Sequence, residues 1–168
     1  MSSGNGNEPQ ASACAAKGKL AIYWAASCGG CEISILGIHE KVLEVDKAFD
    51  IVLFPCGADG KVRDIEKMPD KAIDLCLWNG GIRTSENEYM ARLLRAKSKV
   101  LVAFGSCASE GCIPGLANAS TREEIFKTNY HDSPSLDNPK GVEPQTETKV
   151  PEGTLHLPTF YDRLRTLD

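Results

Sequence analysis

Four short apolar runs dominate the first 104 residues of this 168-residue chain, and they limit its fold more than any other feature. They cover residues 19–25, 49–55, 73–78 and 99–104, and each is followed by a loop that contains glycine. Continuous apolar strands that alternate with helices are typical of a parallel sheet with both faces covered. We therefore expect an α/β fold built on a doubly wound parallel sheet with four recognisable strands.

Helical patterns occupy two of the segments between these runs. After the first run, apolar residues recur at spacings of three, four and three, which predicts one face of a helix. These residues are Ile35, Ile38, Val42 and Val45. After the third run, Ser85 and Glu88 have the spacing of a capping box, which predicts a helix from there to about Lys97.

From residue 118 onward the character of the chain changes. Residues 131–158 carry five prolines and few large apolar side chains, so we expect no fifth strand there. Thr121 with Glu124 predicts the capped start of a short helix, and residues 158–167 suggest one last short helix. We interpret this long irregular C-terminal part as a segment that contacts a partner.

Composition narrows the class of function. The formal net charge of −4 argues against nucleic acid as a partner. No apolar run approaches the roughly 20 residues that a membrane helix requires, so we expect no membrane span. Because the polar start lacks the apolar segment of a secretory signal, the seven cysteines indicate a reducing compartment. The prediction is a cytoplasmic protein of one domain.

Two cysteine pairs follow the first and fourth apolar runs. Cys28 and Cys31 enclose two glycines, and Cys107 and Cys112 lie in the second loop. Since the carboxyl ends of parallel strands meet at one edge of a sheet, both pairs should emerge together. The glycines let the loop bend, and the position of Cys31 at a helix start favours its thiolate. Such thiols suit an iron–sulfur cluster, a zinc ion or a reversible disulfide, although a disulfide would leave the second pair unexplained.

Three segments carry a resemblance to a known family. They are WAASCGGCE (24–32), LCLWNGGIRTSENE (75–88) and VAFGSCASEGCIPG (102–115). In these segments the chain resembles the small, electron-transferring subunit of nickel-iron hydrogenases, including the methyl-viologen-reducing type associated with heterodisulfide reductase. It is more distantly similar to the 20 kDa subunit of NADH:quinone oxidoreductase.

The resemblance implies a flavodoxin-like domain in residues 18–117 that binds a proximal 4Fe-4S cluster. Cys28, Cys31 and Cys107 occupy the positions of three cluster ligands in the family. The implied partners are a hydrogenase-like large catalytic subunit and further iron–sulfur or flavin electron-transfer subunits. The chain would then be the iron–sulfur subunit of an oxidoreductase of anaerobic metabolism, with no complete active site of its own.

The fourth ligand position of the family has no matching motif in this sequence. The family takes that ligand from a later Pro-Gly-Cys-Pro-Pro motif that this sequence lacks, so we expect the segment 118–168 to stop before that motif. Cys112, the last cysteine, is the alternative fourth ligand. A zinc-binding structural or regulatory module, with the metal held by Cys28, Cys31, Cys107 and Cys112, is the competing interpretation.

Four further residues receive simpler interpretations. Cys76 lies inside the third apolar run and is expected in the core. Cys56 follows the second run at the ligand edge and is expected to be a bystander, with a role next to the cluster or as one of its ligands as the alternative. Cys14 has no partner at ligand spacing and lies in residues 1–17, which we expect to form a flexible extension. Glu32 is expected to be a first-turn helix carboxylate.

Overall fold

A computed structural model describes residues 16–58 and 60–167 of the chain. Cys14 and nearly all of the expected N-terminal extension lie outside these residues. Within the described ranges, no helix is long and apolar enough to cross a membrane.

The four apolar runs form one parallel sheet, as the sequence predicts. The strand order is β2-β1-β3-β5, so β1 and β3 lie at the centre and β5 forms one edge. The strands are β1 (Gly18–Trp24), β2 (Phe49–Leu53), β3 (Ile73–Asn79) and β5 (Ser98–Ala103). The carboxyl ends of all four strands therefore point to the same edge of the sheet, and the expected doubly wound α/β fold is confirmed.

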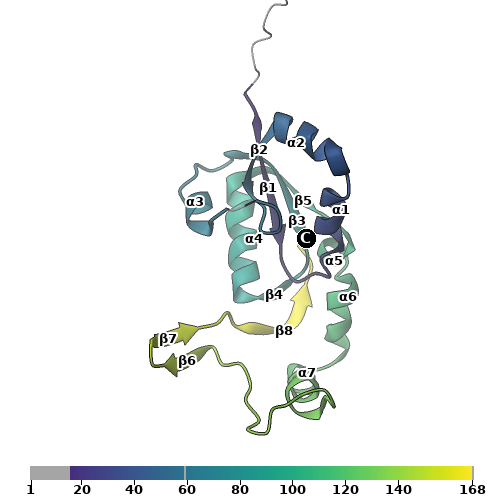
Figure 1. Cartoon of the computed structure of the whole chain (residues 1–168), viewed down its shortest axis with the longest axis vertical. Coiled ribbons are helices and arrows are strands. Elements are labelled where there is room, and N and C mark those ends of the chain that lie inside the picture. Colours follow the sequence, from purple (N-terminus) through teal and green to yellow (C-terminus); the bar gives the residue numbers. More distant parts are fainter. Residues whose placement is uncertain (1–15, 59, 168) are drawn as a thin grey trace, which may run out of the picture.

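Side chains alternate between two cores, one on each face of the sheet. Cys76 and Trp78 of β3 face helix α4 (Ser85–Lys97) and are fully buried against it together with Leu94. Leu20 and Ile22 of β1 face the opposite side and pack on Ile35, Val45 and Phe54. Figure 1 shows α1 and α2 on one side of the sheet and α3 and α4 on the other. The predicted burial of Cys76 follows from this alternation.

The helix after β1 is shorter than its apolar spacing indicates. It divides into α1 (Gly30–Leu36), a 3-10 turn η1 (His39–Lys41) and α2 (Val42–Ala48). The break lies at Gly37 and at His39, whose φ of 55° falls in the left-handed region that a continuous helix excludes. The prediction of one continuous helix is therefore wrong, although α1 and α2 still cover the same face.

The start of α4 lies one residue from the predicted capping box. Thr84 is the N-cap: its hydroxyl accepts from the backbone N–H of Asn87, whose side chain accepts from the N–H of Thr84. Ser85 instead accepts a hydrogen bond from the backbone of Thr159, and Glu88 binds three side chains described below. The remaining helix between strands, α3 (Val62–Glu66), precedes β3.

Residues 158–167 contain a strand and not the expected helix. Strand β8 (Phe160–Arg165) pairs antiparallel with the short β4 (Ile82–Thr84). Its Leu164 is buried so closely against Gly81 that a Cβ there would lie 2.4 Å from the Leu164 side chain. The side chain of Asn118 fixes the backbone of Leu164 by accepting from its N–H at 2.8 Å and donating to its C=O at 2.9 Å. These long-range contacts outweigh the local helical pattern.

Residues 106–156 hold only short elements. The capping box at Thr121 and Glu124 is confirmed and opens α7 (Arg122–Lys127), which continues into a π-helical turn, η3 (Thr128–Asp132). Strands β6 (Glu147–Val150) and β7 (Gly153–His156) make a hairpin that projects from the molecule (Figure 1). The expectation of no further strand in this part is therefore wrong. Between β5 and α7 lie α5 (Ser106–Ser109), α6 (Cys112–Gly115) and η2 (Leu116–Ala119).

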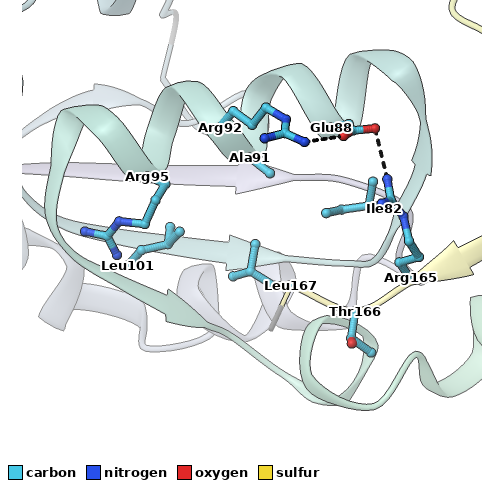
Figure 2. Close-up of a pocket in the computed structure, with 9 residues that line it drawn as sticks. All are labelled: Ile82, Glu88, Ala91, Arg92, Arg95, Leu101, Arg165, Thr166 and Leu167. Atoms are coloured by element: carbon cyan, nitrogen blue, oxygen red, sulfur yellow. Dashed lines mark hydrogen bonds and ion pairs between the residues drawn. The ribbon is translucent and has the colours of Figure 1, made fainter.

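Glu88 of α4 holds β8 in place. Its carboxylate accepts from Arg92 at 2.7 Å, Tyr161 at 2.8 Å and Arg165 at 2.9 Å, and Figure 2 shows the two arginine contacts beside a cavity of about 320 Å³. These hydrogen bonds, led by the one from Arg92, lower the pKa of Glu88 to about 2. Because the pKa in the folded state lies below that of the unfolded chain, the stabilisation is complete above about pH 4.5 and is lost as the pH falls toward 2.

We expect Glu88→Gln to make the stability of the fold depend less on pH below about 4.5. Between pH 4.5 and 2 the thermal unfolding midpoint of the unmodified chain should fall more steeply than that of the variant, because glutamine has no proton to gain. Circular dichroism melts across this range measure the difference. Glu152→Gln in the turn between β6 and β7 is the control and should keep the unmodified slope. If the unfolding midpoints of Glu88→Gln and of the unmodified chain fall equally steeply with pH, this role of Glu88 is contradicted.

Candidate iron–sulfur site

The four cysteines of the two pairs emerge at the carboxyl edge of the sheet. Cys28 is exposed in the loop between β1 and α1, and Cys31 is partly buried in the first turn of α1. Cys107 is buried in α5, directly after β5, and Cys112 is exposed at the start of α6. The sequence separates the pairs by more than 70 residues, whereas the sheet order brings their loops together.

These thiols lie close enough to act on one another. Burial raises the pKa of Cys31, and the charges of Glu32, Cys107, Cys28 and Cys112 raise it further. Burial also raises the pKa of Cys107. A hydrogen bond with the Cys28 backbone lowers this pKa, whereas the charges of Cys28 and Cys112 raise it further. The expectation that the helix start favours the Cys31 thiolate is therefore wrong for the free thiol, because burial and the adjacent carboxylate outweigh the short α1.

Gly105 makes room for Cys31 between the two loops. Its φ of 85° lies in the left-handed region, and a Cβ on it would lie 2.2 Å from the Cys31 Sγ. The backbone after β5 thus passes directly against the sulfur of a cysteine held after β1. Gly29 plays a similar part for Trp24: its φ is 81°, and a Cβ on it would lie 2.7 Å from the indole ring.

Glu32 and Asn79 form a buried contact that the sequence did not reveal. Glu32 is 2% exposed, and its Oε2 accepts a hydrogen bond from Asn79 Nδ2 at 2.5 Å. Asn79 ends β3, is fully buried and also donates to Ser27 Oγ at 3.0 Å. The interpretation of Glu32 as an ordinary first-turn carboxylate is therefore incomplete. The only sequence feature that pointed to a special role for Asn79 is its position in the polar Asn79-Gly80-Gly81 turn, which directly ends an apolar strand.

Other candidate residues lie outside the interacting group. Cys56 is exposed in the loop after β2, and its pKa is raised by burial and then by the charge of Glu32, so it lies near the same edge. The charges that raise the pKa values of Cys31 and Cys107 come from other groups. Arg83 Nη1 donates to Asn118 Oδ1 at 3.2 Å, and its guanidinium lies 4.4 Å from the centre of the Phe160 ring.

The side chains as they stand do not enclose a single metal ion. In residues 16–58 and 60–167, no three histidine, cysteine or acidic side chains form a group that could hold one. The donor chemistry nevertheless fits an iron–sulfur cluster: the soft thiols of Cys28, Cys31, Cys107 and Cys112 lie in loops at one edge, and the Gly105 backbone lies directly against the Cys31 sulfur. The cavity in Figure 2 is lined by no cysteine; its residues come from β4, α4, β5 and the segment 165–167.

Fold and site together define a parallel α/β protein with a cysteine-rich loop pair at the carboxyl edge of its sheet. Residues 28–151 match the family described as NADH ubiquinone oxidoreductase, 20 Kd subunit, and the chain belongs to this family.

Curated relatives are hydrogenase subunits. The chain is 44% identical over 151 residues to an iron-sulfur subunit of the F420-non-reducing hydrogenase of Archaeoglobus profundus, covering 89% of this chain and 47% of that protein. It is 39% identical over 129 residues to a subunit of the vhu F420-non-reducing hydrogenase of Methanocaldococcus jannaschii, covering 77% and 42%. The chain thus spans somewhat less than half the length of these relatives. The family that the sequence motifs indicated is confirmed.

A solved structure supports the fold. The chain aligns with a TM-score of 0.72 and 24% identity to a chain from the crystal structure of an NAD+-reducing NiFe-hydrogenase in the H2-reduced state, covering 90% of this chain and 76% of that one.

Proposed function

We propose that this chain is the electron-transfer subunit of a hydrogenase-like oxidoreductase, and that Cys28, Cys31 and Cys107 hold a 4Fe-4S cluster. The observation that supports this most is the approach of Cys28, Cys31 and Cys107 from loops far apart in the sequence. Such a cluster, when bound, takes up and releases one electron at a time. The relatives named hydrogenase subunits, one of them an iron-sulfur subunit, support the same assignment.

The arrangement of the thiols favours a cluster over zinc. Structural zinc requires four ligands around one ion, each about 2.0–2.3 Å from it. No three suitable side chains in the described part of the chain form such a group. In a 4Fe-4S centre each cysteine binds a different iron, so ligand sulfurs that are near one another but not gathered at a point fit this larger group better.

The cysteine edge is also the proposed contact with a large catalytic subunit. Large apolar side chains next to the site cysteines are mostly exposed: Ile33 is 70%, Ile113 60% and Leu116 73% accessible. Exposed apolar groups around a site are typical of an interface that another subunit covers. An electron-transfer cluster at this edge would lie close to the next redox centre. The cytoplasmic location inferred from the cysteines stays a prediction.

Metal analysis of the native protein tests the function directly. We expect anaerobically purified protein to be brown and to contain iron and acid-labile sulfide in nearly equal amounts, with an electron paramagnetic resonance signal that appears on reduction. It should copurify with a large subunit. Colourless protein with one zinc per chain would contradict the electron-transfer function and support the zinc module instead.

A further inference from the structure

One buried side chain holds both ends of the Cys28–Cys31 loop. Asn79 donates from Nδ2 to Ser27 Oγ at 3.0 Å and to Glu32 Oε2 at 2.5 Å. Ser27 directly precedes Cys28, and Glu32 directly follows Cys31. The last residue of β3 is therefore connected to the residue on either side of the cysteine pair.

Backbone contacts fix the same loop to the end of β3. The C=O of Asn79 accepts from the N–H of Ala25 at 2.7 Å, and Ala26 and Gly81 exchange hydrogen bonds at 3.1 and 2.8 Å. Ser27 Oγ accepts a second hydrogen bond from the N–H of Gly29 at 3.0 Å. These hydrogen bonds define the conformation of the loop without any bound group. The Asn79 side chain connects the loop to the first turn of α1.

The polar network of Ser27, Glu32 and Asn79 contributes little to the stability of the fold. Among the described residues, Glu32 Oε1 and Asn79 Oδ1 are buried without a hydrogen-bond partner. Burial of unpaired polar or charged atoms is unfavourable, and apolar residues of similar shape are often equally stable or better at such positions. The benefit of the network therefore lies in the geometry that it imposes.

We propose that Asn79 is a positioning residue that clamps Ser27 and Glu32, so that the thiols of Cys28 and Cys31 face Cys107 before a cluster binds. The nature of the bound group rests on the proposed function, but the clamp belongs to the metal-free chain. Residues that orient metal ligands typically change metal affinity by about 10- to 100-fold when replaced. Asn79 acts in this way through its hydrogen bonds to Ser27 and Glu32.

A double variant separates positioning from stability. Asn79→Leu combined with Glu32→Leu removes both unpaired oxygens and replaces the two polar side chains by apolar ones, so in the full chain we expect a thermal unfolding midpoint that is unchanged or higher. Iron release to a chelator should nevertheless become about tenfold faster. In the metal-free protein, amide hydrogen exchange across residues 25–32 should accelerate as well. Glu32→Gln alone keeps an oxygen that accepts from Asn79 and should retain iron like the unmodified chain.

The matched control lies at the other end of the same strand. Ile73 is fully buried at the start of β3, and Ile73→Ala should lower the unfolding midpoint without changing iron release or exchange in residues 25–32.

Two results would overturn the proposal. One is a double variant with unmodified iron retention and loop protection, and the other is a double variant that unfolds, because the network would then stabilise the fold. Absence of iron from the unmodified protein would instead defeat the proposed function, and the exchange measurement on the metal-free chain would still decide on the clamp.

Discussion

Serine in place of Cys28, Cys31 or Cys107 is expected to remove most of the iron from the protein and to abolish or convert the electron paramagnetic resonance signal of the reduced state. Each substitution replaces a soft thiolate by a hydroxyl that binds iron weakly. For Cys28 and Cys31 the effect should be far larger than any change in folding, because Cys28 is exposed and Cys31 partly exposed. Iron and sulfide content of the anaerobically purified native protein, together with the spectrum, measures the result.

Cys112→Ser should leave iron content and spectrum nearly intact. Cys107 and Cys112 come from one short loop, so two sulfurs from it would crowd a site that also takes Cys28 and Cys31. If Cys112→Ser empties the site as thoroughly as the other three substitutions, the ligand set is instead Cys28, Cys31, Cys107 and Cys112.

Cys56→Ser is the matched control for this series. Its thiol is exposed in the loop after β2, near the same edge of the sheet, and lies outside the proposed ligand set. It should keep both the iron and the spectrum, which would show that losses in the other variants come from the ligand positions and not from the removal of any nearby thiol.

The sheet was predictable because each of its four strands is a short apolar run, and the central strands β1 and β3 are largely buried. Such runs predict strands of one parallel sheet, in which β1 and β3 proved central and β2 and β5 outer, and the loops after the first and fourth runs then share the carboxyl edge. This argument needs no knowledge of side-chain contacts. It placed Cys28, Cys31, Cys107 and Cys112 near one another from their sequence positions alone.

Features that depend on distant contacts could not be inferred in the same way. Residues 158–167 carry a locally plausible helical pattern, but pairing with β4 and the double hydrogen bond from Asn118 to Leu164 make them a strand. Similarly, Glu32 and Asn79 are 47 residues apart, and neither residue type predicts a buried contact with the other. The capping box begins at Thr84, one residue before the predicted Ser85. The prediction missed by one residue because Thr84 with Asn87 and Ser85 with Glu88 both have side chains that suit this motif.

Gly105→Ala is expected to disrupt the site and destabilise the chain. The added methyl group would lie 2.2 Å from the Cys31 Sγ, and alanine disfavours the φ of 85° at this position. The strained backbone alone costs about 1–3 kcal/mol, and relief of the overlap would require either the loop after β5 or the Cys31 side chain to move.

The change therefore predicts a lower unfolding midpoint together with a loss of bound iron, measured by thermal melts and by the iron-to-protein ratio. Gly115→Ala is the matched control, because a Cβ there meets no atom within 4 Å and its φ of −69° is helical. Alanine at that position should be neutral or slightly stabilising, by about 0.4–1 kcal/mol, with full iron content. Full iron content in Gly105→Ala would mean that the close approach of Gly105 to Cys31 is not required for the proposed cluster, and that the loop after β5 adapts around the added methyl group.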